Sequence, residues 1–305
     1  MISEDDRNSD VEVPEGLSQD LSRRDFVALS AAGGLGLAAG VAQAADAAVV
    51  VRDVEIKTAD GTCDAAFIHP ASGVHPGVVI WTDIFGLRPT FRELGRRLAA
   101  SGYSVLVPNP FYRTVKAPVL TEAELSRFNF SDPAMRAKMM QWASTVNEPG
   151  TGARDATALV DFLDAQREVD TKRKIGTQGY CMGGPLVFKT AAARPDRIGA
   201  GATFHGGGLV TDKPDSPHLL IPKIKARMYI AIAASDDEKQ PDAKDKLREA
   251  FAAAQVPAQV EVYAGTQHGW CVPDMPVQNG KPIYNKPDAE RAWRKLLALY
   301  KEQLA

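Results

Sequence analysis

The sequence has little of what several classes of protein require. It contains three cysteines, Cys63, Cys181 and Cys271, which are too few for a disulfide framework and lack the paired C-x-x-C spacing of a zinc site. Its five histidines are scattered and form no H-x-x-x-H motif, so we expect no metal and no other cofactor. Lys and Arg number 36 against 38 Asp and Glu, and the absence of a basic stripe argues against a nucleic-acid partner.

The odd number of cysteines leaves at least one thiol unpaired within the chain. A bridge between Cys63 and Cys271 that leaves Cys181 free is arithmetically possible. Nothing in the sequence places those two residues near each other, so this pairing stays open.

The first part of the chain differs in composition from the rest. Residues 1–21 are polar and acidic, which is typical of disorder. Arg23 and Arg24 then precede a stretch from Phe26 to Ala45 that has no charged residue and ends in the A-x-A triplet 42–44. This pattern resembles a bacterial twin-arginine export signal.

The resemblance implies two parts: a disordered N-terminus with a signal peptide over residues 1–45, and a folded domain over 46–305. We expect cleavage near Ala44, a periplasmic mature protein, the twin-arginine machinery as a partner, and membrane contact only during export. The alternative is an uncleaved anchor, since the uncharged run could nearly span a bilayer. Glycines at positions 33, 34, 36 and 40 would weaken such a helix.

After residue 48, short β-branched runs alternate with longer helical patterns. Strands are predicted at 49–56, 63–70, 77–81, 103–108, 174–180, 198–206, 227–234 and 258–265, with Asp60-Gly61 turning the first hairpin. Helices are predicted at 90–102, 151–166, 241–254 and 286–304. The alternation predicts an α/β fold in one domain, with a mostly parallel sheet of about eight strands and helices on both faces.

The hexapeptide "GYCMGG", residues 179–184, follows one of these strands. In a strand-turn-helix context, the pattern G-x-nucleophile-x-G is the nucleophile elbow of an α/β-hydrolase. Gly179 and Gly183 stand where a tight turn would crowd a Cβ atom, and Cys181 would lie near a helix N-terminus that stabilises a thiolate. The alternative is a glycine-rich turn that holds a buried structural cysteine.

The other members of a catalytic triad follow in the hydrolase order, nucleophile, acid and histidine. Asp236 and Asp237 come after the strand that ends near residue 234, and His268 comes after the strand that ends near residue 264. We expect both segments to be loops at the carboxyl edge of the sheet, where open α/β sheets bind their ligands.

The constellation resembles the dienelactone hydrolase family, which are thiol-dependent α/β-hydrolases. The resemblance covers roughly residues 50–300 and is carried by "WTDIFGLRP" (81–89), "VPNPFYR" (107–113), "GTQGYCMGG" (176–184), "DDEKQP" (236–241) and "YAGTQHGW" (263–270). It implies that Cys181 is the nucleophile and His268 the base. The family acid is followed four residues later by proline, and this spacing favours Asp237 over Asp236.

The resemblance also implies an oxyanion hole from the backbone amides of Ile84 and Met182. Arg113 matches a family arginine that contacts the substrate carboxylate and the acid of the site. Asp83 stands where the family often has a glutamate that helps to control the thiol, and it is one methylene shorter. The family's second substrate-binding arginine has no counterpart in "HGWCVPD" (268–274), which argues against dienelactone itself as the substrate.

The expected activity is hydrolysis of a small ester or lactone through a Cys-His-Asp triad and a thioester intermediate. One alternative is a general thiol carboxylesterase with no preference for lactones. Another is an exported binding protein that has kept the fold without turnover, and the shorter side chain of Asp83 is the feature that favours it.

Overall fold

The computed structural model describes residues 48–129, 131–277 and 280–305. The predicted signal, its cleavage near Ala44 and the domain boundary at 45/46 lie outside the described residues, and these remain predictions. In the described part of the chain, no helix is both long enough and apolar enough to cross a membrane.

Eight strands form one sheet in the order β1-β2-β4-β3-β5-β6-β7-β8. The strands are β1 (Val49–Thr58), β2 (Gly61–Pro70), β3 (Gly77–Trp81), β4 (Ser104–Pro108), β5 (Ile175–Tyr180), β6 (Ile198–Phe204), β7 (Arg227–Ala233) and β8 (Ala258–Tyr263). The β1–β2 and β2–β4 pairs are antiparallel, and every other pair is parallel. The predicted fold class, a mostly parallel α/β-hydrolase sheet, is confirmed.

The first hairpin turns one residue earlier than predicted. Thr58 pairs with Gly61, so Ala59 and Asp60 form the two-residue turn. Gly61 has a φ of 140°, which lies in the region that favours glycine. The glycine therefore starts the second strand instead of completing the turn.

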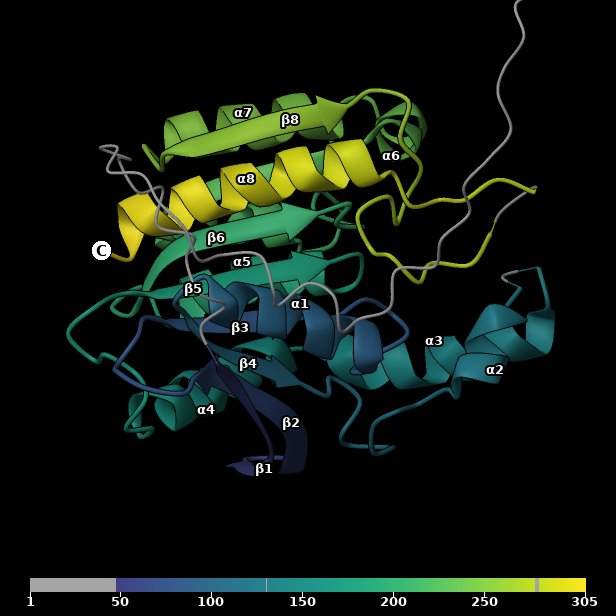
Figure 1. Cartoon of the computed structure of the whole chain (residues 1–305). Helices are drawn as coiled ribbons and strands as arrows, with labels where there is room; N and C mark the ends of the chain where they lie inside the picture. Colours follow the sequence, from purple (N-terminus) through teal and green to yellow (C-terminus); the bar gives the residue numbers. More distant parts are fainter. Residues whose placement is uncertain (1–47, 130, 278–279) are drawn as a thin grey trace, which may run out of the picture. The chain divides into compact units, whose positions relative to one another are not determined.

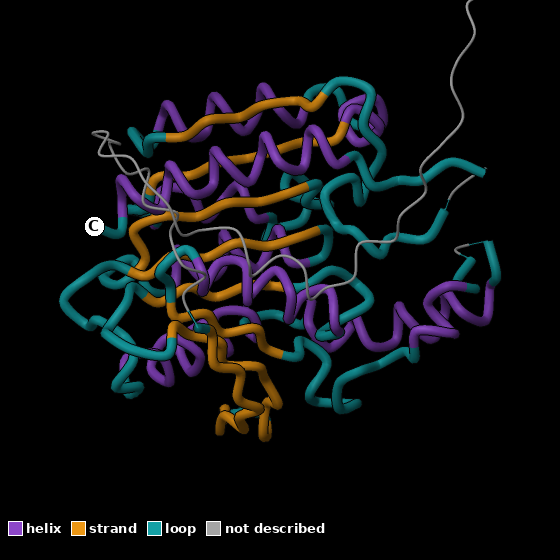
Figure 2. The backbone as a smooth tube through the Cα atoms, in the orientation of Figure 1, coloured by secondary structure: helices purple, strands orange, loops and turns teal. Residues whose placement is uncertain are grey.

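Helices cover both faces of the sheet (Figures 1 and 2). They are α1 (Pro89–Ala100), α2 (Glu122–Ser126), α3 (Pro133–Asn147), α4 (Thr151–Asp164), α5 (Gly183–Ala193), α6 (Ala234–Lys239), α7 (Ala243–Ala253) and α8 (Lys286–Gln303), with a 3₁₀ helix, η2, at Pro217–Lys223. Figure 1 shows α1 and α8 in front of the sheet and α4, α5 and α7 behind it. The buried apolar side chains form two clusters accordingly, one on each face.

Apolar spacing accounts for the way these helices pack. In α1, Phe91 and Leu98 are fully buried, and Leu94 is packed against the same cluster, as their helical spacing predicts. Strands β3 and β4 are buried along their whole length, as expected for strands covered on both faces. The helices on the two faces hold the parallel strands side by side, so that their carboxyl ends lie at the same end of the sheet. The arrowheads of β5, β6 and β8 point towards this end in Figure 1.

The start of α5 lies directly against the end of β3. A Cβ atom built on Gly183 would lie 2.6 Å from the backbone oxygen of Trp81 and 2.8 Å from that of Thr82. Neither oxygen belongs to a flexible side chain, so no side-chain rotation could relieve the contact. Glycine is therefore required for this helix to approach the sheet so closely.

A Gly183→Ala variant should lose about 1–3 kcal/mol of unfolding free energy, because the added methyl group overpacks rigid backbone. Gly207→Ala is the matched control, since a Cβ atom there would meet nothing within 4 Å. It should change the stability by less than about 0.5 kcal/mol. Urea unfolding of both variants measures the difference, and equal stabilities would contradict the close approach.

Candidate active site

Cys181 occupies a strained turn between β5 and α5. Its φ is 51°, in the left-handed region that residues other than glycine rarely adopt. Its amide donates to the Phe204 oxygen at 3.1 Å, and its own carbonyl accepts from the amides of Gly184 at 3.0 Å and Gly207 at 3.3 Å. A Cβ atom on Gly179 would lie 2.2 Å from the Gly183 oxygen. This geometry has the features of the predicted elbow.

The sulfur of Cys181 meets the imidazole of His268. A hydrogen bond joins the two side chains, and the other side of the ring is held by Asp236, with Nδ1 2.7 Å from Oδ2. Cys181 is half-buried, and the side chains of His268 and Asp236 are 31% and 20% exposed. The three groups are therefore in contact, and a substrate has access to them.

The sequence favoured Asp237 as the acid of the triad. In the structure, the carboxylate that contacts the imidazole is that of Asp236, so this preference is wrong. Asp237 turns away and binds the ammonium group of Lys244 at 2.7 and 2.9 Å. The physical reason is a short helix, α6, where a loop was expected. Neighbouring residues on a helix face different directions, so only one of the two aspartates can face His268.

The loop that carries His268 is attached to the start of α6. The amide of His268 donates to Ser235 Oγ at 2.9 Å, and the amide of Ser235 donates to the Thr266 oxygen at 3.1 Å. Thr266 Oγ1 accepts from the amide of Ala234 at 3.2 Å. These bonds hold the loop of His268 against the start of α6, which carries Asp236, and so keep the two side chains next to each other. In the sequence, the hydroxyl groups of Ser235 and Thr266 are the only sign of these bonds.

The pKa of His268 is raised to about 10. Burial acts in the opposite direction, because it disfavours the charged ring. Negative charge on Cys181 and hydrogen bonds from the ring to Asp236 and Cys181 outweigh the burial. The ring is consequently an imidazolium at neutral pH.

His205 packs against this pair from the end of β6. Its ring lies 4.9 Å from that of His268 in an edge-to-face arrangement, and it is only 1% exposed. Neither ring nitrogen has a hydrogen-bond partner in the described structure. Burial and the neighbouring His268 hold the pKa of His205 well below its usual value. His205 therefore stays neutral beside the charged histidine.

The two predicted oxyanion donors lie on adjacent elements. Met182 is the N-cap of α5 and Ile84 lies in the loop after β3. The two elements touch where Gly183 lies against Trp81 and Thr82. Both side chains are half-buried. Within the described residues, neither amide donates to a protein acceptor. Both are thus available to a substrate oxygen.

Asp83 is held by an arginine that the sequence analysis did not single out. Arg88 donates to both oxygens of Asp83, at 2.7 and 2.9 Å, and to both oxygens of Asp274, at 2.8 and 2.7 Å. Asp83 Oδ1 also accepts from the amide of Phe85 at 2.9 Å. Asp83 is 1% exposed and Arg88 4% exposed. The carboxylate of Asp83 is therefore engaged inside a buried ion cluster, and the structure does not bring it to Cys181.

Arg113 does not lie with the triad either. Its guanidinium group binds both oxygens of Asp155 in α4, at 2.9 and 2.7 Å, and Asp60 in the first hairpin turn, at 2.6 Å. It also lies over the ring of Tyr112, 4.5 Å from the centroid. The expectation that it contacts the acid of the site is wrong, because two other carboxylates already satisfy it.

The remaining thiols are buried and free. Cys63 belongs to the apolar cluster on the α4–α5 face, and Cys271 to the cluster on the α1–α8 face. Burial raises the pKa of both thiols. The open question of a Cys63–Cys271 bridge is thereby answered: the structure contains none.

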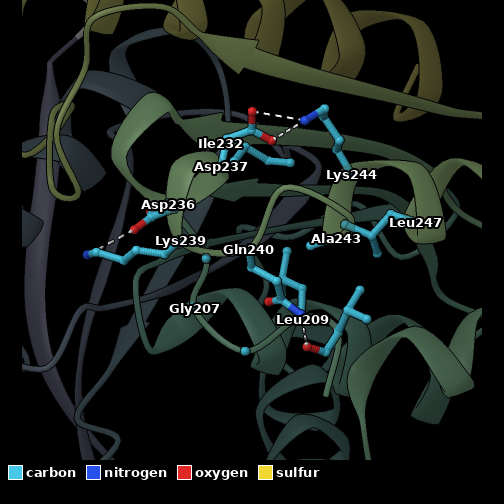
Figure 3. Close-up of a pocket in the computed structure, with 13 residues that line it drawn as sticks. Gly207, Leu209, Ile232, Asp236, Asp237, Lys239, Gln240, Ala243, Lys244 and Leu247 are labelled. Carbon is cyan, nitrogen blue, oxygen red and sulfur yellow. Dashed lines mark hydrogen bonds and ion pairs between the residues drawn. The ribbon is translucent and has the colours of Figure 1, made fainter. Parts of the chain in front are cut away.

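A cavity of about 230 Å³ lies beside the triad (Figure 3). It is lined by the following residues: Gly206, Gly207, Gly208, Leu209, Val210, Ile232, Asp236, Asp237, Lys239, Gln240, Ala243, Lys244 and Leu247. It borders the elbow, since the amide of Gly207 donates to the carbonyl of Cys181. Figure 3 shows Lys244 turned to Asp237 and Lys239 beside Asp236.

Comparison with known proteins identifies the family of the chain. The family model described as "Dienelactone hydrolase family" matches residues 63–304. The chain belongs to the dienelactone hydrolase family. It is accordingly a hydrolase of ester bonds, as the sequence predicted.

Relatives within the dienelactone hydrolase family are distant. A putative carboxymethylenebutenolidase of Methylorubrum extorquens is 27% identical over 287 residues, which cover 90% of this chain and 91% of that protein. A carboxymethylenebutenolidase of Rhodococcus opacus is 26% identical over 214 residues, which cover 69% of this chain and 77% of that protein. The crystal structure of the dienelactone hydrolase-like promiscuous phosphotriesterase P91, from metagenomic libraries, has a TM-score of 0.68 and 24% identity over 85% of this chain and all of that chain.

An Asp236→Asn variant should lower the pKa of His268 from about 10 towards its ordinary value near 6.5, because the ring loses an ionic partner. Asp237→Asn is the matched control and should leave the pKa of His268 unchanged, since Asp237 binds Lys244. NMR titration of labelled histidines measures both values. A larger shift in the Asp237 variant would reverse the assignment.

Proposed function

We propose that this family member hydrolyses a small ester or lactone through Cys181, His268 and Asp236, with a thioester intermediate. The observation that carries the proposal is the imidazole of His268, which binds the Cys181 side chain and the Asp236 carboxylate at the same time. The relatives named carboxymethylenebutenolidase support the substrate class.

In the first half of the reaction, the ionised sulfur of Cys181 attacks the carbonyl carbon. The developing oxyanion accepts from the amides of Ile84 and Met182, each of which typically lowers the barrier by about 3 kcal/mol. The carbon–oxygen bond then breaks, and the departing alkoxide takes the proton of the His268 imidazolium. In a lactone the alkoxide stays attached, because the ring has opened.

In the second half, a water molecule gives a proton to the now neutral His268, and its oxygen attacks the thioester carbon. The carbon–sulfur bond breaks, and the acid leaves. The sulfur and the imidazolium regain their starting charges. Asp236 orients the ring and stabilises its charged form throughout, without being protonated itself.

Cys181→Ala should abolish turnover of a panel of 4-nitrophenyl esters and small lactones, because no nucleophile remains. Asp236→Asn should lower kcat by about a hundredfold or more, whereas Asp237→Asn should stay within about threefold of the parent. Spectrophotometric rates on the panel measure all three. Equal rates in the parent and the Cys181 variant would end the proposal.

The panel also separates the alternatives. Hydrolysis of esters without lactones would identify a general thiol carboxylesterase. No turnover of any compound by a folded parent protein would favour a binding protein that has kept the fold.

We also propose that the protein is exported by the twin-arginine route and works in the periplasm. The support is the sequence: the Arg23-Arg24 pair, the uncharged stretch from Phe26 to Ala45, and the A-x-A triplet. Fractionation of cells should find the parent in the periplasm and an Arg23→Lys/Arg24→Lys double variant in the cytoplasm. A parent protein confined to the cytoplasm would contradict the proposal.

A further inference from the structure

We infer that the substrate of this site is a neutral ester or lactone, with no carboxylate near its scissile carbonyl. The inference rests on the proposed function, because it concerns the substrate of that same site. Its basis is that the cations near the site are already bound to carboxylates of the protein.

Arg113, the residue expected to anchor a substrate carboxylate, is occupied. Its two terminal nitrogens make three hydrogen bonds, two to Asp155 and one to Asp60. Two of its five donors remain, one N–H of Nη1 and Nε. Nε has no partner and is buried from solvent, so a ligand has no path to it. The side chains of Arg113 and Asp155 are only 10% and 9% exposed. A substrate carboxylate would have to displace a buried partner.

Arg88 is occupied in the same way. Asp83 and Asp274 each take two of its hydrogen bonds, and the guanidinium group also lies over the rings of Phe85 and Phe91, 5.4 and 4.9 Å from their centroids. Removing one partner from a buried ion cluster leaves an uncompensated charge, which proteins tolerate poorly. Arg88 therefore holds two loops together and has no free donor face for a ligand.

The lysines at the cavity provide no better anchor. Lys244 directs its ammonium group at both oxygens of Asp237 and at the Pro241 carbonyl, which uses all three donors. Lys239 is 74% exposed and lies 3.9 Å from Asp236 Oδ1. Its charge is therefore hydrated and sits beside the triad acid (Figure 3).

The balance of charge favours a neutral ligand. With the Cys181 sulfur ionised as in the proposed reaction, five negative groups surround the site and the cavity against four cations. The negative groups are Cys181, Asp83, Asp236, Asp237 and Asp274, and the cations are Arg88, Lys239, Lys244 and the His268 imidazolium. The wall nearest the elbow is glycine backbone with Leu209 and Val210. A neutral acyl or alcohol group meets dipoles and apolar atoms there, whereas a carboxylate meets net negative charge without a free partner.

The test compares two esters of the same leaving group, 4-nitrophenyl butyrate and the mono-4-nitrophenyl ester of succinic acid. The neutral ester should have a kcat/KM at least about tenfold higher, because like charges oppose binding of the succinate. Raising the salt concentration should raise kcat/KM for the succinate ester only, since screening weakens the repulsion.

Arg113→Met, with Arg113→Lys as a milder second variant, tests the expected anchor directly. Any loss of kcat/KM should affect both esters alike, so that their ratio stays within about threefold of the parent ratio. A preference for the succinate ester, or its selective loss in the Arg113 variants, would overturn the inference and leave the proposed function standing. Failure of the folded parent to hydrolyse either of these esters or any compound of the ester and lactone panel would instead refute the proposed function, and the inference with it.

Discussion

The backbone of Cys181 is held in a left-handed conformation by close contacts on both sides, and the chemistry of the site depends on this constraint. The carbonyl of Cys181 accepts from two amides, and its own amide is bonded to β6. The glycines around it allow α5 to touch the end of β3. One tight turn thus directs the sulfur towards His268 and places the amides of Met182 and Ile84 on neighbouring elements.

Two charge clusters, each centred on an arginine, hold loops of the fold in place. Arg88 ties the loop after β3, which contains Ile84, to Asp274 in the segment after His268. Arg113 ties the segment after β4 to α4 and to the first hairpin. In both clusters the arginine binds carboxylates of the protein itself. Arg88 therefore stiffens the loop that contains Ile84, and Arg113 stiffens the segment after β4.

Much of this could be predicted because the relevant forces are local. The apolar run at 77–81 and the helical spacing of Phe91, Leu94 and Leu98 are visible in the sequence, and the corresponding elements formed. The choice between Asp236 and Asp237 failed because it depends on the helical direction of α6, which six residues do not reveal. The Arg88–Asp274 pair joins residues 186 positions apart, and no local pattern reports such a contact.

The central claim is that Cys181 is the accessible, reactive thiol of the site, whereas the thiols of Cys63 and Cys271 are buried. Brief treatment of the native protein with iodoacetamide, followed by mass spectrometry of its peptides, tests this most directly. The account predicts rapid labelling of Cys181, with Cys63 and Cys271 unmodified, because burial raises the pKa of both. Labelling of Cys63 or Cys271 in folded protein whose Cys181 remains unmodified would contradict it.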